Sequence, residues 1–528
     1  MEHAEYLAEL LDKPHEECGV VGVILDNNSA SEKLYLGMQG VQHRGELGAG
    51  MSVSNGNEIN TYKDVGLVTD IFQPKKLEEM IGYSGIGHTR YATTATGRES
   101  SKKDAVKKLH PFEGKIKGQN PFGSGRKKLF SVAFNGTITN YTKLRKELKK
   151  YGFETDTDTE VIKCLIEEGY DISKDILDSL AYAYMKLEGA YSIVLVDREG
   201  NLYAMKDGHG FKPLCIGEIS NKEEKGYIFA SESRAVDFLD AKLIREIEPG
   251  EIVKITKNME VKSSYMIKKK KSLCFFEYVY FASPDSVIEG VNVNNVRVRL
   301  GKNLWKEMPM DIETGEKDKN WRVIPVPDSG RSSASGYAGE GKLKKREGLM
   351  RNRYYPKRTF INGNPDERKN AAKSKSQKYN VIKEVVEGKD VILVDDSIVR
   401  GNTMHNIINR IKDAGANSVH LKISCPPIRH PCYMGIDFPT HEQLIANNPK
   451  VIGEGNPIQI YEKDVDEICS EIGADSLQYI SLEGLLNAIK GDVREISDCS
   501  LCLACLTGEY PCKIENELLD KVEYVKKE

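Results

Sequence analysis

The sequence predicts a protein of mixed α/β and α+β class, with two large domains and a parallel sheet in the second one. Three observations lead to this prediction. The chain has 528 residues, and at roughly 150 residues per domain this length suggests two to four domains. Short strand-like runs alternate with amphipathic helical patterns as far as about residue 256. After residue 272, β-rich segments are followed by helical or glycine-rich stretches, which is typical of βα units on a parallel sheet.

The composition excludes several classes of protein. Charged residues make up 29% of the chain and hydrophobic residues 39%, the balance of an ordinary globular protein. The net charge of −3 indicates no general surface for nucleic acid or membrane. No apolar run approaches the ~18 residues that a membrane span needs. We therefore expect a soluble, cytoplasmic protein that binds neither nucleic acid nor membrane.

Residues 1–17 are acidic and amphipathic. An export signal would have a basic start and an apolar core of about 7–15 residues, so this stretch is not expected to be one. The run CGVVGVIL that follows is typical of a buried strand, and it starts abruptly at Cys18.

The first domain is predicted to span residues 18–256. Helices are expected at KLYLGMQGVQH, TEVIKCLIEEGY and ISKDILDSLAYAYMKLEG, and strands at SGIGHTRYA, LFSVAFNG, AYSIVLVD, GYIFASES and GEIVKI. The Lys-, Gly- and Ser-rich stretch 97–126 is expected to be a loop. A basic, low-complexity segment predicts a linker over residues 257–272.

The second domain is predicted to span residues 273–480. Its expected strands are WRVIPVPDSG, RTFING, KDVILVDDS and SVHLKIS. Residues 481–528 are expected to form a tail that is first helical and then rich in cysteine.

The segment VILVDDSIVRGNTMHNIINRIKDAG carries the sharpest motif. Its apolar strand brings Asp395 and Asp396 to the strand's C-terminal end. Gly401 lies in the loop, Thr403 is the expected N-cap, and a helix follows with apolar residues at i, i+3, i+4 and i+7 from Met404. Backbone N–H groups at a helix start favour a phosphate, and the acid pair suits ribose hydroxyls and Mg²⁺. Strand, acid pair, hydroxyls and glycine coincide here, which favours this interpretation over a generic turn with solvated acids.

This segment resembles the phosphoribosyl diphosphate (PRPP) loop of type I phosphoribosyltransferases. Together with VIPVPDSGRSSASGYA, EGLMRNRYYPKRTFI and the N-terminal half, it is similar to the amidophosphoribosyltransferase family. The resemblance implies an αββα N-terminal-nucleophile domain, of the class II glutaminase kind, followed by a type I phosphoribosyltransferase domain. It also implies glutamine-dependent transfer of ammonia to PRPP, which gives 5-phosphoribosylamine, glutamate and pyrophosphate in the first step of de novo purine biosynthesis.

In this family a propeptide is removed so that a cysteine becomes the first residue. Cys18 takes that position, and residues 1–17 would be the propeptide. A thiol with a pKa of about 8.5 needs a base at neutral pH, and a freed α-amine of pKa about 7.7–8 could serve. By itself, a cysteine at the start of a strand is more often a core residue.

Three further motifs match the family's glutamine site. Arg90, in GHTRYAT, would bind the glutamine carboxylate, a task suited to a guanidinium. Asn135 and Gly136, in FNGTITN, would be the oxyanion-hole donors. Asp158, in TDTDTE, would bind the α-ammonium. Asn-Gly alone is a common hairpin turn, so their joint order after Cys18 supports the assignment.

For the PRPP site, the resemblance implies that Asp395 and Asp396 hold the ribose hydroxyls and Mg²⁺, with Ser329 as a further metal-associated residue. A mobile loop that closes over PRPP maps to residues 351–358, which hold one residue more than the family pattern. The residues that would cradle the 5-phosphate are Ser397, Val399, Arg400, Gly401, Asn402 and Thr403.

The chain has eleven cysteines. Four thiolates that include one CxxC would suit either an iron–sulfur cluster or tetrahedral zinc. The family favours a [4Fe–4S] cluster, with a structural or oxygen-sensing role, on Cys274, Cys432, Cys502 and Cys505.

The family also implies purine nucleotides as feedback inhibitors and a homotetramer or homodimer. Two other interpretations remain open at this point. A class II amidotransferase that makes glucosamine phosphate or asparagine would need a different second half. A non-catalytic iron–sulfur or nucleotide-sensing regulator would be expected to have lost Cys18, Asp395 or Asp396.

Overall fold

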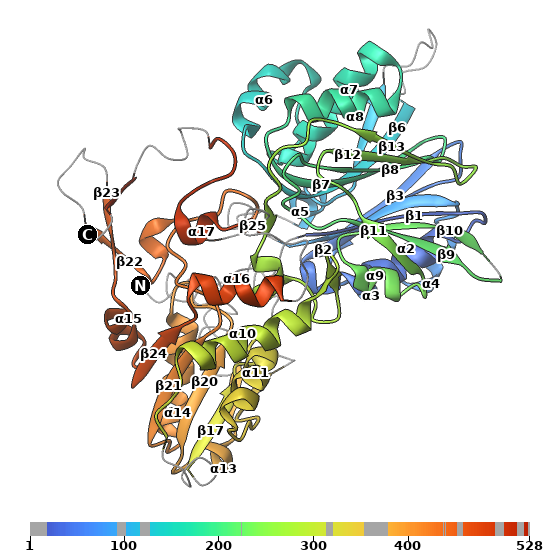
Figure 1. The fold of residues 1–528 in the computed structure, drawn as a ribbon. Coiled ribbons are helices and arrows are strands. Elements are labelled where there is room, and N and C mark those ends of the chain that lie inside the picture. Colours follow the sequence, from blue (N-terminus) through green and yellow to red (C-terminus); the bar gives the residue numbers. More distant parts are fainter. Residues whose placement is uncertain are drawn as a thin grey trace.

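The computed structural model describes residues 18–91, 102–116, 127–222, 224–312, 320–352, 378–436, 438, 440–450, 458–491, 501–514 and 522–525. Two bodies lie side by side (Figure 1). The N-terminal half of the chain, blue to green, forms the first body, and the C-terminal half, yellow to red, forms the second.

Two antiparallel sheets build the first body. The seven-stranded sheet has the order β11-β9-β10-β1-β4-β2-β3, and the six-stranded sheet has the order β13-β12-β8-β7-β6-β5. Their strands are β1 (Gly19–Leu25), β2 (Gly48–Ser54), β3 (Ile59–Val65), β4 (Ser84–Arg90), β5 (Phe112–Ile116), β6 (Lys127–Ile138), β7 (Gly189–Asp197), β8 (Leu202–Lys206), β9 (Cys215–Ser220), β10 (Lys225–Ala230), β11 (Lys242–Glu246), β12 (Glu251–Ile255) and β13 (Val261–Tyr265).

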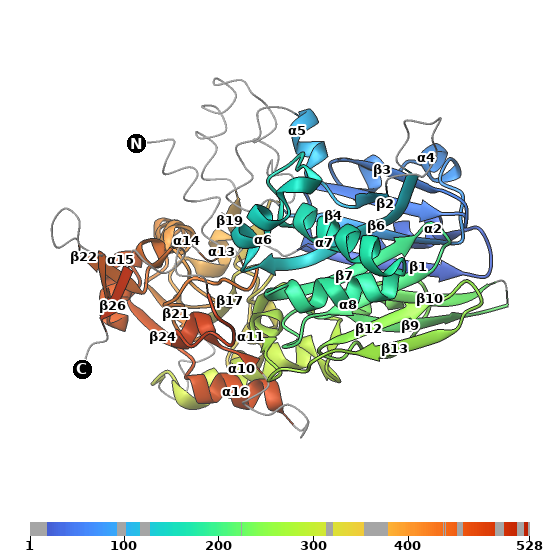
Figure 2. The same cartoon turned by 90° about the horizontal axis from the view of Figure 1, so that it is seen from above.

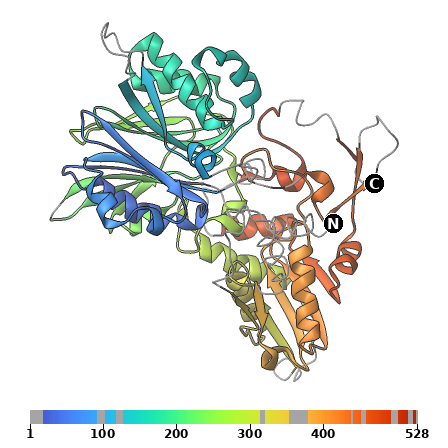
Figure 3. The same ribbon diagram turned by 180° about the vertical axis from the view of Figure 1, so that it is seen from behind.

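Helices cover the outer face of each sheet. On the six-stranded sheet lie α7 (Asp158–Ser173) and α8 (Ile176–Lys186), and on the seven-stranded sheet lie α2 (Ala30–Gly40) and α9 (Ser233–Asp237), as Figure 3 shows from behind. Apolar side chains such as Val20, Ile86 and Val194 fill the space between the sheets. This αββα arrangement confirms the predicted fold class. The shorter helices of this body are α3 (Val68–Ile71), α4 (Pro74–Glu78), α5 (Lys102–Lys107) and α6 (Tyr141–Glu147).

Two stretches of the first body differ from the prediction. The expected loop over 97–126 contains α5 and the strand β5, which pairs with β6 and buries Phe112. The expected linker over 257–272 contains β13, which pairs with β12. Most β13 side chains are exposed, so hydrophobic patterning does not mark this strand, and backbone hydrogen bonds to β12 hold it in the sheet.

A four-stranded parallel sheet of order β17-β20-β21-β24 forms the centre of the second body, as predicted. Its strands are β17 (Trp321–Pro325), β20 (Asp390–Asp395), β21 (Ser418–Ile423) and β24 (Ser476–Tyr479). Figure 2 shows α14 (Asn402–Asp413) on one face, and α10 (Val293–Glu307), α11 (Arg331–Gly341) and α16 (Leu482–Lys490) on the other.

Smaller elements complete the second body. They are β14 (Leu273–Cys274), a π-helical turn (Glu277–Phe281), β15 (Val287–Ile288), β16 (Val291–Asn292), β18 (Leu349–Arg351), β19 (Tyr379–Val381), α13 (Lys383–Val386), β22 (Asn447–Lys450), β23 (Ile458–Glu462), α15 (Val465–Ile472), β25 (Leu501–Cys502), α17 (Ala504–Thr507) and β26 (Val522–Val525). The predicted strand RTFING lies outside the described residues. Within the described ranges, no helix combines the length and apolar character of a membrane span.

Candidate active sites

Cys18 immediately precedes β1, and β1 lies between β4 and β10 in the seven-stranded sheet. Burial raises the pKa of the Cys18 thiol, while the backbone N–H of Tyr91 and the charge of Arg90 oppose the rise. Asp158 raises the pKa further. The fold therefore brings three predicted residues, Cys18, Arg90 and Asp158, into one site, although 140 positions separate the first from the last.

Asn135 and Gly136 lie within β6, where they pair with Ser192 and Tyr191 of β7. The Asn-Gly pair is thus part of a strand and not a hairpin turn. Gly136 has φ of 147°, and a Cβ there would stand 1.9 Å from the carbonyl oxygen of Ala190, so only glycine fits.

The side chain of Asn135 is 1% exposed. Its Nδ2 has no hydrogen-bond partner among the described residues. A buried amide donor left without an acceptor costs about 1–3 kcal/mol, so its retention calls for an explanation such as a ligand oxygen.

Asp158 is the first residue of α7, and its carboxylate accepts the backbone N–H groups of Ile138 and Thr159. Burial raises its pKa to about 6, while these hydrogen bonds and the charge of Arg90 hold the rise back. Because Ile138 ends the strand that carries Asn135, β6 positions both the amide donor and the carboxylate.

These groups suit one chemistry. A thiol can attack a carbonyl carbon, and an amide and a backbone N–H can stabilise the oxyanion that forms. A guanidinium and a carboxylate beside them match the two charged groups of a free amino acid.

The second predicted site lies at the carboxyl ends of the parallel strands. Asp395 ends β20, and both Asp395 and Asp396 are buried. Ser329 follows β17, the neighbouring strand, and its Oγ donates to Oδ1 of Asp395 at 3.3 Å. The Oγ of Ser397 donates to Oδ2 of Asp396 at 2.5 Å. Ligands often bind at this edge of a parallel sheet, and these carboxylate and hydroxyl oxygens are the atoms that Mg²⁺ prefers.

The loop after the acid pair leads directly into α14. The helix begins at Asn402 with Gly401 as its N-cap, so the prediction that Thr403 is the N-cap was wrong. Gly401 has φ of 87°, and a Cβ would stand 2.2 Å from Cδ1 of Ile445. Gly401 has no side chain with which to cap the first turn, so a bound anion could interact with its N–H groups.

Two other loop residues are anchored by the segment around residue 444. The carbonyl of Val399 accepts the N–H of Ile445 at 2.8 Å. The guanidinium of Arg400 donates to Oε1 of Gln443 at 3.2 and 3.4 Å. Of the predicted closing loop, Arg351 and Asn352 are described, and Arg351 forms an ion pair with Asp328 at 3.3 Å.

The four predicted cluster ligands lie together where the two bodies meet. Cys274 of β14 and Cys502 of β25 are partners in a parallel bridge, and the N–H of Cys274 donates to the carbonyl of Phe211 in the first body. Burial raises the pKa of Cys505 well above its ordinary value, and the neighbouring thiols of Cys432, Cys274 and Cys502 raise it further.

No group of three or more His, Cys, Asp or Glu residues in the described part of the chain is arranged to hold a metal ion. The sulfur of Cys432 accepts the N–H of Met434 at 3.3 Å. A fifth cysteine, Cys512, lies close by and donates to Sδ of Met434, while Cys499 is outside the described residues.

Sequence reasoning missed a buried charge network that joins the two bodies. Arg44 Nε donates to the carbonyl of Cys18 at 3.4 Å. Its two Nη atoms lie 2.6 Å from Glu232 and 2.8 Å from Glu277, the latter in the second body. The motif QHRG contains Arg44, but nothing in the sequence shows which carboxylates lie beside it.

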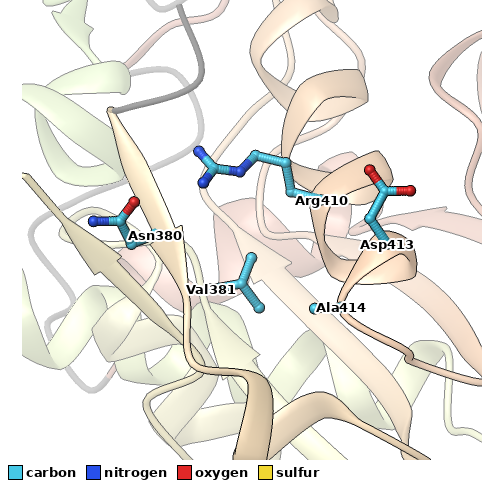
Figure 4. Close-up of a pocket in the computed structure, with 5 residues that line it drawn as sticks. All are labelled: Asn380, Val381, Arg410, Asp413 and Ala414. Carbon is cyan, nitrogen blue, oxygen red and sulfur yellow. The ribbon is translucent and has the colours of Figure 1, made fainter. Parts of the chain in front are cut away.

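A hollow of about 400 Å³ lies elsewhere, beside β19 and the last turns of α14 (Figure 4). The side chain of Arg410 extends from the helix toward the strand that carries Asn380. A helix of 12 residues is about 18 Å long, so this hollow is remote from the loop at Gly401. Its lining residues are Asn380, Val381, Arg410, Asp413 and Ala414.

Comparisons with known proteins identify relatives along almost the whole chain. Residues 108–237 match the family model of a glutamine amidotransferase domain. A protein of Methanocaldococcus jannaschii named amidophosphoribosyltransferase is 40% identical over 519 residues, 95% of this chain and 98% of the relative. The Bacillus subtilis protein of the same name is 37% identical over 502 residues, 95% of each chain.

Two solved structures match with similar coverage. One is described as the allosteric regulatory enzyme of purine biosynthesis, with a TM-score of 0.78, 37% identity, and coverage of 95% of this chain and 97% of that one. The other is the glutamine PRPP amidotransferase from B. subtilis complexed with ADP and GMP, with a TM-score of 0.77, 36% identity, and coverage of 95% and 98%.

Proposed function

The chain belongs to the amidophosphoribosyltransferase family, and from that premise we propose how its residues divide the reaction. Its activity is glutamine-dependent transfer of ammonia to PRPP, which gives 5-phosphoribosylamine, glutamate and pyrophosphate in purine biosynthesis. Identity of 40% along 95% of the chain, across both bodies, carries this assignment. It sets aside the amidotransferases with another second half and the non-catalytic regulator.

In the first body, we assign the nucleophile to Cys18. Its sulfur attacks the amide carbon of glutamine, the tetrahedral intermediate expels ammonia, and water hydrolyses the resulting thioester to glutamate. Nδ2 of Asn135 and the N–H of Gly136 donate to the oxyanion. The lack of a described partner for the buried Asn135 amide supports this role.

The base for this step is assigned to the α-amine of Cys18 after removal of residues 1–17. The raised pKa of the thiol supports the need for a base, because a thiol protonated at neutral pH is a weak nucleophile. An α-amine of pKa about 7.7–8 can accept its proton and then pass it to the departing nitrogen, which leaves as ammonia.

Two charged residues are assigned to the ends of the glutamine substrate. Arg90 binds the α-carboxylate, and Asp158 binds the α-ammonium. Both act electrostatically on the Cys18 thiol, which supports their placement around one small substrate.

In the second body, PRPP is proposed to lie over the acid pair and the start of α14. Asp395, Asp396 and Ser329 would hold Mg²⁺, and the buried oxygen atoms that they supply fit a hard cation. Bound Mg²⁺ would neutralise charge on the pyrophosphate leaving group. Residues 397 and 399–403 would cradle the 5-phosphate, and ammonia would displace pyrophosphate from C1.

The four cysteines are proposed to hold a [4Fe–4S] cluster. The mutual proximity of Cys274, Cys432, Cys502 and Cys505 supports the ligand set. Four thiolates also suit tetrahedral zinc, and the family resemblance is what favours the iron–sulfur cluster. Burial raises the pKa of Cys274 and Cys502, and the charge of buried Lys212 offsets only part of that rise. Iron, sulfide and zinc analysis of protein purified without air tests this assignment.

Regulation, assembly and location are also proposals. The matched B. subtilis structure holds ADP and GMP, which supports feedback inhibition by purine nucleotides. A homotetramer or homodimer is proposed from the family. No disulfide joins the described cysteines, in keeping with a reducing cytoplasm.

The proposed function is tested by assaying glutamate and pyrophosphate together. Glutamine should yield pyrophosphate only when PRPP is present, with glutamate formed in step. Intact mass of the active protein should show Cys18 as the first residue. An active protein that retains Met1 would overturn the α-amine mechanism.

A further inference from the structure

His110 lies two residues before the start of β5 and has no role in the chemistry derived above. Its side chain is buried, and both ring nitrogens have partners. Nε2 lies 2.5 Å from Oγ1 of Thr159. The backbone N–H of Phe134 donates to Nδ1 at 3.4 Å.

These contacts define the ring's protonation. Burial lowers the pKa of His110 well below its ordinary value, and the charges of His88, Arg90 and Lys63 lower it further, so the ring is neutral. Because Nδ1 accepts a backbone N–H, the single ring proton is on Nε2 and is donated to Thr159.

Three neighbours of this ring lie one or two residues from a residue of the glutamine site. Phe134 precedes Asn135 on β6, and Thr159 follows Asp158 on α7. On β4, the ring of His88 lies 4.0 Å from that of His110, centroid to centroid. His88 and Arg90 share one face of β4, since they are two residues apart.

The segment around His110 is itself held firmly. Nζ of Lys63, on β3, donates to the carbonyls of Leu109 at 2.5 Å and Pro111 at 3.2 Å. On β2, a Cβ at Gly50 would stand 2.0 Å from the carbonyl oxygen of His110, so backbone packs against backbone there. The backbone around His110 is therefore held by β2 and β3, while the imidazole contacts β4, β6 and α7.

We propose that His110 is a positioning residue for glutamine. Its imidazole holds β4, β6 and α7 in the register at which Arg90, Asn135 and Asp158 converge on one amino acid. This positioning role rests on the functions proposed for those three residues. His110 itself makes and breaks no bond of the substrate.

The test separates glutamine use from ammonia use in the whole protein. A misplacement of about 1 Å can cost ~10²-fold in rate, so His110→Ala should raise the KM for glutamine and lower glutamine-dependent kcat/KM by at least about tenfold. PRPP conversion driven by ammonia, and the KM for PRPP, should stay unchanged. His110→Gln, which keeps a donor and an acceptor, should restore part of the glutamine affinity.

Thr159→Val removes the partner hydroxyl at nearly constant volume. Its effect on the KM for glutamine should be absent in the His110→Ala background, because the two changes break the same hydrogen bond. His420→Gln, a matched change in the second body, should leave the KM for glutamine unaltered.

Two results would overturn the inference. The first is a normal KM for glutamine in His110→Ala, measured beside an Arg90→Ala variant that no longer uses glutamine. In that case the assigned role of Arg90 stands and the positioning role of His110 does not. The other is a parallel loss of ammonia-dependent activity, which would indicate general damage to the fold. If Arg90→Ala also uses glutamine normally, the inference and the assigned roles fall together.

Discussion

At the scale of single residues, the proposed glutamine site combines a buried donor with a buried acid. Asn135 and Asp158 are both positioned by β6, one directly and one through the N–H of Ile138. The amide of Asn135 has no described acceptor, and burial raises the pKa of the Asp158 carboxyl although it accepts backbone N–H groups. A substrate that brings an oxyanion and an ammonium would satisfy both.

Replacement of Asn135 by Ala should lower kcat for glutamine about 10²–10³-fold with little change in KM, because the lost hydrogen bond forms chiefly in the transition state. Steady-state kinetics with glutamine, beside an ammonia-driven control that should not change, measure this. A large rise in KM with normal kcat would instead place Asn135 in ground-state binding.

The affinity for glutamine should fall in acid. The pKa of Asp158 is raised to about 6 by burial, and only the ionised form attracts the α-ammonium. As pH falls through about 6, the carboxyl gains a proton and the KM for glutamine should rise. Profiles of KM against pH for the parent and for Asp158→Asn check this, since the variant should have a high KM with no inflection. An inflection that survives in the variant would assign the titration to another group.

At the scale of elements, the sequence predicts best where hydrophobic pattern and burial coincide. Strands β1, β7 and β20 are apolar and buried along almost their whole length, so their positions follow from the sequence. Strand β13 is exposed and β5 is short, so their pairing depends on neighbours distant in the sequence. The same limit applies to His110, whose partners Phe134 and Thr159 lie 24 and 49 residues away.

The start of α14 gives an element-scale prediction. Gly401→Ala places a Cβ 2.2 Å from Ile445 at a φ of 87°, so the loop must shift and the KM for PRPP should rise several-fold or more. Glutamine hydrolysis should persist. Gly388→Ala is the matched control, because Gly388 also has a positive φ, of 65°, but faces open space. It should carry only the backbone strain of about 1–2 kcal/mol, measured by thermal unfolding. Equal PRPP defects in both variants would contradict a specific role for Gly401.

At the scale of the molecule, two buried groups of residues link the bodies. Arg44 connects the Cys18 carbonyl to Glu277. The cysteine group consists of residues from β14, from the segment at Cys432 and from the tail, and it packs beside Phe211. The candidate cluster ligands and the residues of both candidate active sites could be proposed from motifs in the sequence. Their junction could not, because it depends on how two separately patterned halves pack together.

We propose that the two bodies catalyse separate half-reactions joined by ammonia. PRPP conversion by the Cys18→Ala variant should be measured once with glutamine and once with ammonia. Glutamine should no longer support pyrophosphate release, while ammonia should support it at the rate of the parent enzyme. Loss of both activities, or retention of the glutamine-dependent one, would show that the half-reactions are not divided in this way.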